Sequence, residues 1–283
     1  RENLIADTCV LYSVGSSGNL VKIDNQYLTC GIYQYCDSIF DGGVGSLGMV
    51  YKFSEEGDTI WTKKFYSQSY SIIYRGARTK NKAYVSAGVA VDTSTSITQF
   101  YLVKIDSSAN IIWEKTFDYL LNNYAFSIDS YTNGDFIIGG LTDPTTSFSE
   151  TDGYIAKLDS SGNLIWQKKI GTIDDDRGCV ARITLDQQNI YLQQSLDTVV
   201  SIGDAPMPNY VGKLDNNGNF IWRTFFNGPY KQDIWGIREM DNKSIVVVGI
   251  KNVDDVSQGR GFICKLDSNG VKLWERTYYT RTD

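Results

Sequence analysis

The sequence predicts an all-β fold: a five-bladed β-propeller with four antiparallel strands per blade and one extra N-terminal strand. The first observation is a repeat: five tryptophans stand 52, 53, 56 and 52 positions apart, at Trp61, Trp113, Trp166, Trp222 and Trp274. The second is that each Trp follows a β-rich run and a polar turn, which is typical of a β-hairpin. The third is that no stretch shows sustained helical periodicity. We expect the five Trp side chains to be structural and to fill the wedge between blades.

The turn before each Trp has its own chemistry. The third copy reads Lys157-Leu-Asp-Ser-Ser-Gly-Asn-Leu-Ile-Trp166, and a glycine recurs at Gly57, Gly162, Gly218 and Gly270. Glycine suits a tight hairpin that needs a positive φ. The second copy has Ala109 at this place, and there we expect Asn110 to take the left-handed conformation instead.

We expect one closed domain over residues 1–283. The predicted blades cover residues 19–66, 70–117, 125–170, 179–226 and 233–279, with residues 1–14 as the extra strand. Three roles for that strand remain open: closing the ring beside the fifth blade, a remnant of a longer propeller, or a strand donated to a neighbouring molecule. Because the chain opens at Arg1, we expect it to be processed or trimmed.

Composition excludes several classes of protein. The chain has no His, which removes Ser-His-Asp and Cys-His catalysis and the commonest transition-metal ligand. The net charge is −6 with acids and bases interspersed, so no basic stripe for nucleic acid is present. No apolar run approaches the roughly 18 residues that a membrane span needs.

The five cysteines contain no CxxC pair, which argues against zinc or iron–sulfur binding. Two disulfides are candidates: Cys30–Cys36, across the end of one strand, and Cys9–Cys264. Buried free thiols are the equal alternative, because free Cys is among the most buried residue types.

The repeat carries a pattern, Lys-x-Asp-x-x-Gly-x-x-x-Trp, for instance at Lys213, Asp215, Gly218 and Trp222. On this pattern the chain resembles the Trp-anchored repeats of quinoprotein-like β-propellers, and the propeller repeats of bacterial and archaeal surface proteins. The resemblance covers nearly the whole chain and implies the fold. The quinoprotein motif has a Thr before its Gly and is one residue longer, and residues that would contact a quinone or hold its Ca²⁺ are not recognisable here.

Strand alternation places the short turns on one face of the ring and the long, variable loops on the other. Loops on a rigid scaffold often carry binding sites. Candidate ligand-binding residues on the long-loop face are Tyr70, Tyr124, Arg177, Tyr230, Asp233 and Trp235.

We expect no cofactor. The densest acidic run, Asp174-Asp175-Asp176, is the candidate for calcium. A run of like charges is more often a solvated surface, and the spacing of a calcium loop is absent.

Two functions follow. The favoured prediction is a non-catalytic, secreted or cell-surface module that binds glycans or proteins through the long-loop face, with homo-assembly through terminal strands as a further expectation. The alternative is a carboxylate-dependent glycoside hydrolase of the five-bladed type. The favoured prediction rests on the expectation that near-equivalent repeats put like groups at like places, whereas catalysis needs unlike acidic groups.

Overall fold

The computed structural model describes residues 20–37, 43–65, 70–92, 94–145, 150–171, 176–196, 209–226, 232–251 and 259–278. These residues form twenty strands and no helix, which confirms the prediction of an all-β fold. The predicted extra strand within residues 1–14 lies outside the described residues.

Five runs of four consecutive antiparallel strands make up the molecule, and we call them units 1 to 5. Unit 1 contains β1 (Val21–Ile23), β2 (Gln26–Asp37), β3 (Gly43–Ser54) and β4 (Thr59–Lys64). Unit 2 contains β5 (Ser71–Arg78), β6 (Tyr84–Asp92), β7 (Ile97–Ile105) and β8 (Ile111–Phe117). Unit 3 contains β9 (Asn122–Ser130), β10 (Phe136–Asp143), β11 (Asp152–Leu158) and β12 (Leu164–Ile170). Unit 4 contains β13 (Asp176–Ile183), β14 (Asn189–Leu196), β15 (Asn209–Asp215) and β16 (Phe220–Phe226). Unit 5 contains β17 (Gln232–Glu239), β18 (Ile245–Lys251), β19 (Arg260–Leu266) and β20 (Lys272–Tyr278).

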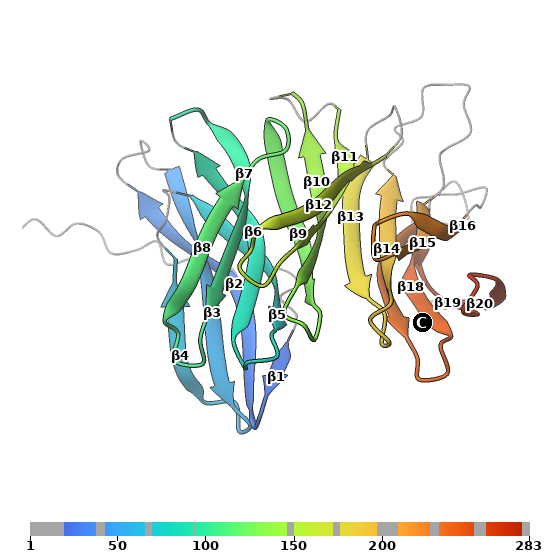
Figure 1. Cartoon of the computed structure of the whole chain (residues 1–283), viewed down its shortest axis with the longest axis horizontal. Coiled ribbons are helices and arrows are strands. Elements are labelled where there is room, and N and C mark those ends of the chain that lie inside the picture. The colour runs from blue at the N-terminus through green and yellow to red at the C-terminus, as the bar shows by residue number, and fades with distance from the viewer. Residues whose placement is uncertain are drawn as a thin grey trace, which may run out of the picture.

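The units follow one another across the molecule from unit 1 to unit 5 (Figure 1). The first strands of successive units contact each other, as β1 does with β5 and β5 and β13 do with β9. The first strands therefore lie on the inside of the arrangement, and the fourth strands, which carry the repeated Trp, lie on the outside.

The predicted division into five separate four-stranded blades is not confirmed. Units 1, 4 and 5 are four-stranded sheets, but units 2 and 3 form one eight-stranded sheet through a parallel bridge between Thr98 and Asn122. A buried polar network holds this bridge: the Thr98 hydroxyl donates to Asn122 Oδ1 at 3.1 Å, and Asn123 Nδ2 donates to the Thr98 carbonyl at 3.1 Å. Among the described residues no sheet closes on itself.

The third turn, between the last two strands of a unit, is built around an Asp side chain in units 2 to 5 and around Ser54 in unit 1. In unit 3, Asp159 Oδ1 accepts the backbone N–H groups of Ser161 and Asn163, both at 2.8 Å. Gly162 has φ +76°, as the sequence predicted for this position. In unit 2 the left-handed residue is Ala109 itself, with φ 67°, and the expectation for Asn110 is wrong. The equivalent cap by Asp106 on the Ser108 and Asn110 N–H groups holds the turn despite the Cβ of Ala109.

Trp113, Trp166 and Trp222 each pack against this turn of the next unit. A Cβ added to Gly218 would lie 2.9 Å from the Trp166 indole, and one added to Gly162 would lie 3.1 Å from Trp113. Trp166 Nε1 also donates to the Asn216 carbonyl at 2.9 Å. Glycine is thus favoured in this turn for two reasons: the position has a positive φ, and the neighbouring indole occupies the space that a side chain would need.

Four hydrophobic clusters fill the spaces between consecutive units. Fully buried members include Val50 and Tyr101 between units 1 and 2, Phe100 and Ile138 between units 2 and 3, Ile155 and Leu192 between units 3 and 4, and Val211 and Val247 between units 4 and 5. Within the described part of the chain no such cluster joins unit 5 to unit 1, and the two units stand at opposite ends of the molecule (Figure 1).

Neither candidate disulfide is formed. Cys30 and Cys264 are free, buried thiols. Cys30 and Cys36 stand six residues apart on the same strand, β2, so about 20 Å of extended chain separates them. Cys264 is fully buried in the cluster between units 4 and 5, and Cys9 lies outside the described residues.

Replacing Trp166 by Ala should lower the free energy of unfolding by about 3 kcal/mol, because it removes a large aromatic contact and strands the carbonyl of Asn216. Denaturant unfolding measures the loss. The neighbouring Ile165 is 51% exposed, so Ile165→Ala is the matched control and should cost under about 0.5 kcal/mol. Equal losses for the two variants would contradict a structural role for the indole.

Candidate functional site

Four inner strands each carry a β-bulge at about the same place. The register shifts fall between Ile73 and Arg75 in β5, opposite Gly139 and Gly140 in β9, between Asp176 and Cys179 in β13 and between Ile234 and Gly236 in β17. A bulge leaves a residue unpaired and re-aims its side chain. In three of these strands the unpaired residue is aromatic: Tyr74, Phe126 and Trp235.

Two of these bulge residues belong to an aromatic cluster on β5 and β9. The Tyr74 and Phe126 rings meet edge to face with centroids 5.5 Å apart, and Tyr124 lies 6.1 Å from Phe126. Burial raises the pKa of Tyr74, and the nearby Tyr124 and Tyr70 raise it further. Burial also raises the pKa of Tyr124, so Tyr74 and Tyr124 present protonated hydroxyl groups together with their ring faces.

Nearer the carboxyl ends of the inner strands lies a group of charges. Asp129, Arg182 and Arg238 occupy the same position, two residues before the first turn, in units 3, 4 and 5. The corresponding residue of unit 2 is Ala77. Equivalent positions of the repeat thus hold unlike groups, contrary to the expectation on which the favoured function rested.

Asp129 is a carboxyl group held in a desolvated position between units 3 and 4. Its Oδ2 accepts the Ile183 N–H at 3.0 Å, and its Oδ1 accepts the Ser130 N–H at 2.9 Å. Burial raises the pKa of Asp129, and the two N–H groups and the charges of Arg182 and Arg238 oppose this only in part. The net effect favours the protonated form more than in an exposed Asp.

A further guanidinium belongs to the same region. Burial lowers the pKa of Arg75 on β5, and the positive charge of Arg182 lowers it further, so these two side chains lie close enough to repel each other. Arg182 and Arg238 therefore bring positive charge to Asp129, and Arg75 lies near Arg182.

A second carboxyl group, that of Glu239 at the end of β17, approaches the same turn from unit 5. Its Oε2 accepts the Leu185 N–H at 2.6 Å, and its Oε1 lies 3.5 Å from the Tyr191 hydroxyl, which donates to it. Asp129 and Glu239 thus bind backbone N–H groups two residues apart, at Ile183 and Leu185, on either side of the end of β13. These N–H groups have no partner strand in a sheet, and carboxyl groups from the neighbouring units accept their hydrogen bonds instead.

The residues predicted for the long-loop face are only partly brought together. Tyr70 and Tyr124 share the aromatic cluster with Tyr74. Trp235 is 66% exposed on β17, and Asp233 lies near Asn209, whose Nδ2 is 3.5 Å from Asp233 Oδ1. Asp233 stands at the opposite end of β17 from Glu239, so it belongs to a different end of the inner strands. The assignment of these four residues to a ligand stays a prediction.

The other predicted site residues lie outside what the structure describes. They are Tyr230, the side chains of Arg177 and Asp176, and Asp174 with Asp175. Within the described ranges no group of three or more His, Cys, Asp or Glu side chains is placed to hold a metal ion. Calcium at Asp174, Asp175 and Asp176 therefore stays a prediction.

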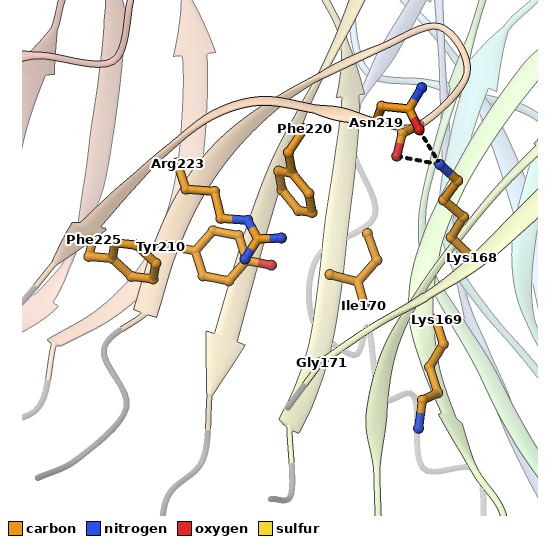
Figure 2. Close-up of a pocket in the computed structure, with 10 residues that line it drawn as sticks. Lys168, Lys169, Ile170, Gly171, Tyr210, Asn219, Phe220, Arg223 and Phe225 are labelled. Carbon is orange, nitrogen blue, oxygen red and sulfur yellow. Dashed lines mark hydrogen bonds between the residues drawn. The ribbon is translucent and has the colours of Figure 1, made fainter. Parts of the chain in front are cut away.

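A separate groove of about 530 Å³ lies on the outside, between β12 of unit 3 and strands β15 and β16 of unit 4 (Figure 2). The Arg223 guanidinium lies 3.6 Å from the centre of the Phe220 ring and 5.3 Å from that of Tyr210. Lys168 Nζ donates to the Gly218 carbonyl at 3.0 Å and to Asn219 Oδ1 at 2.8 Å. No carboxylate is among the described residues that line this groove, so it can bind a flat or anionic group but offers no carboxyl pair for glycoside hydrolysis.

The sequence patterns alone did not single out Asp129, Arg182, Arg75, Arg238 or Glu239. A usable signal was present: when the repeats are aligned on their first turns, the position two residues earlier reads Ala77, Asp129, Arg182 and Arg238. A solvent-facing position would tolerate such variation, so only the burial of Asp129 distinguishes the site.

Comparisons with known proteins place the fold. No protein-family model and no curated protein sequence matches this chain. Among solved structures, puromycin hydrolase is similar with a TM-score of 0.54 and 10% identity over 92% of this chain and 39% of that one. The β-propeller domain of the Trilobed protease from Pyrococcus furiosus, described as having an open velcro topology, has a TM-score of 0.50 and 8% identity over 87% of this chain and 68% of that one. An exo-β-1,3-galactanase from Phanerochaete chrysosporium has a TM-score of 0.49 and 10% identity over 90% and 61% of the two chains.

These similarities define the class as an all-β, propeller-like protein. At such low identities they show the fold alone, and the TM-score of the galactanase is too low to carry an argument. The chain spans 39% of the length of puromycin hydrolase and 61% of the galactanase. The specific resemblance to quinoprotein-like repeats is not among the similarities found.

The favoured prediction of a non-catalytic binding module is contradicted. The similar structures include that of an enzyme, puromycin hydrolase, which agrees better with the alternative of a hydrolase than with a non-catalytic module. The physical reason lies in the inner strands, where unlike side chains occupy equivalent positions. No helix in the described ranges is long and apolar enough to cross a membrane, in agreement with the sequence.

The raised pKa of Asp129 predicts a pH dependence of stability. Between the ordinary Asp pKa of about 3.9 and the raised folded-state value, the folded state keeps a proton that the unfolded state has lost. The free energy of unfolding of the wild type should therefore fall, relative to Asp129→Asn, as pH rises through this window, and then stay constant. Denaturant unfolding of both proteins across the acid range measures the difference.

Asp186 is a control of opposite sign. The Thr184 hydroxyl, the Gln188 N–H and Lys243 lower the pKa of Asp186 to about 2. Its contribution to stability is present above the unfolded-state pKa and is lost as pH falls toward 2, so the wild type should gain stability relative to Asp186→Asn as pH rises through that range. Slopes of the same sign for the two variants would contradict the assignment for Asp129.

Proposed function

We propose that this chain is a propeller glycoside hydrolase whose chemistry depends on the carboxyl groups of Asp129 and Glu239. The observation that carries the proposal is the desolvated position of Asp129 at the inner strands, where burial raises the pKa of its carboxyl group. Glycoside hydrolysis needs one carboxyl group that donates a proton and a second that acts as base or nucleophile.

The placement of the two groups supports the pairing. The two carboxyl groups bind the N–H groups of Ile183, the last residue of β13, and of Leu185, in the turn that follows it, so both lie at the same end of that strand. Carboxyl pairs in glycoside hydrolases are separated by about 5 to 9.5 Å, with the longer distances leaving room for a water molecule. In this proposal Asp129 is the general acid, and Glu239 is the general base.

The surroundings point to the substrate class. Arg182 and Arg238 bring positive charge to Asp129, which suits a glycan that carries carboxylate or sulfate groups. The rings of Tyr74, Tyr124 and Phe126 offer faces on which sugars can stack.

The finer predictions of the sequence belong to the same proposal. We propose that the five units are the blades of a propeller built from Trp-anchored, quinoprotein-like repeats. We also propose that the protein acts outside the cell or at its surface on glycans and needs no cofactor, with calcium at Asp174, Asp175 and Asp176 as the one metal to test.

The experiment is a hydrolysis assay on neutral and acidic polysaccharides with reducing-end detection. Asp129→Asn and Glu239→Gln should each lower kcat by roughly 10²–10⁴-fold, because each removes a proton-transfer group. Asp135→Asn, at the neighbouring turn, is the matched control and should leave kcat within about twofold of the wild type. The absence of turnover on every substrate, or turnover that survives both substitutions, would refute the proposal.

A further inference from the structure

The contact between consecutive units follows one rule along the chain. A Lys or Trp side chain of the earlier unit donates a hydrogen bond to the backbone carbonyl of the residue that follows the turn Asp in the next unit. Lys52 donates to Ser107 O and Lys104 to Ser160 O, both at 3.0 Å. Trp166 donates to Asn216 O at 2.9 Å and Trp222 to Ser268 O at 3.2 Å. Each unit thus has a receiving face with a Trp and a Lys, and a turn that fits the receiving face of the unit before it.

Unit 5 has a receiving face that the described residues leave uncovered. Trp274 is 42% exposed, and on the same face Val248 is 39% and Tyr278 52% exposed. Trp274 pairs with Lys265 across β19 and β20, as Trp166 pairs with Lys157 in unit 3. The components of the repeated contact are therefore present, but no described turn occupies them.

Unit 1 has the complementary, uncovered turn. Gly57 has φ +93°, and a Cβ placed on it would meet nothing within 4 Å. At the equivalent Gly270 the Trp222 indole lies within 2.6 Å of such a Cβ. On the same side of unit 1, Tyr51 and Phe53 stack with ring centroids 6.0 Å apart and are only half-buried. Their counterparts in unit 3, Ala156 and Leu158, are fully buried against unit 2.

The charges of the two surfaces are opposite. The unit 1 turn carries Glu55, Glu56 and Asp58 around Gly57. The receiving face of unit 5 carries Lys265, which is the cross-strand partner of Trp274, and Arg276, which lies two residues after Trp274 on the same side of β20. Neither side chain forms an ion pair within the described part of the chain. Complementary charge favours association of these two surfaces and disfavours contact of either surface with a copy of itself.

Units 1 and 5 of one molecule stand at opposite ends (Figure 1), so the two surfaces do not meet within one chain. We propose that they meet between molecules: unit 5 of one copy binds unit 1 of a second copy, head to tail, with the Gly57 turn seated on Trp274. By the repeat rule, Trp274 Nε1 or Lys265 Nζ donates to the Glu55 carbonyl of the second copy. Such a contact joins different surfaces, so each added copy leaves one receiving face free.

The test is sedimentation velocity of the 283-residue chain over a range of concentrations, without substrate. We expect a mean mass that rises with concentration past the dimer and falls when salt is added. Trp274→Ala should weaken self-association at least about tenfold. Ile221→Ala, which removes an equally exposed apolar side chain (53%) from β16, is the control and should leave self-association unchanged.

A charge exchange tests the orientation of the contact. Glu56→Lys and Arg276→Glu should each weaken self-association, and the chain carrying both substitutions should recover it, because both surfaces then have reversed charge. Circular dichroism and thermal melting verify folding, and Tyr278→Ser replaces Trp274→Ala if that variant does not fold.

Three outcomes would overturn the proposal. The first is a monomer at every concentration. The second is self-association that neither Trp274→Ala nor the charge reversals weaken. The third is a monomer in which Trp274 is protected from acrylamide quenching, since this would mean that another part of the same chain covers the receiving face. None of these measurements depends on hydrolysis, so failure of the proposed enzyme activity and failure of this proposal are distinguishable.

Discussion

The structure depends on the contact between a Trp of one unit and the third turn of the next. The indole can approach because the turn residue is glycine, and the glycine is also what the positive φ requires. In units 3 and 4 the indole N–H binds a turn carbonyl, so a large apolar contact and a directional one select the same geometry. Four-stranded sheets on their own would leave both faces unfilled, and this contact is what makes them a single body.

The candidate site follows from the same arrangement. Packing the units side by side brings their first strands together and leaves the inner edges of those strands without sheet partners. Side chains take over that role: Ser127 Oγ accepts the Ala181 N–H, and the carboxyl groups of Asp129 and Glu239 accept those of Ile183 and Leu185. Satisfying backbone groups at an inner edge thereby places two acids at one end of β13, with Arg182 and Arg238 near Asp129. The requirement of the fold and the chemistry of the site are met by the same residues.

Much of the fold could be predicted from local chemistry. The Trp period and the turn glycines each have a local physical cause, and the all-β class follows from the strands around them. The errors have tertiary causes. The bridge between Thr98 and Asn122 merges two blades into one sheet through a buried network of residues distant in sequence. Cys30 and Cys36 cannot pair because β2 runs straight between them.

The sequence by itself determined the repeat, the all-β class and the chemistry of each turn, because these depend on residues within a few positions of each other. Only the tertiary structure decided which acids matter. Asp129 has the same local surroundings as many strand-end acids, and its raised pKa comes from burial beside a neighbouring unit more than 50 residues away. The same holds for Trp274. The sequence around it matches that around the other four repeated Trp residues, but its side chain is exposed because no following unit packs against it in the described chain. Local sequence encodes a unit, whereas desolvation and exposure depend on what packs against it.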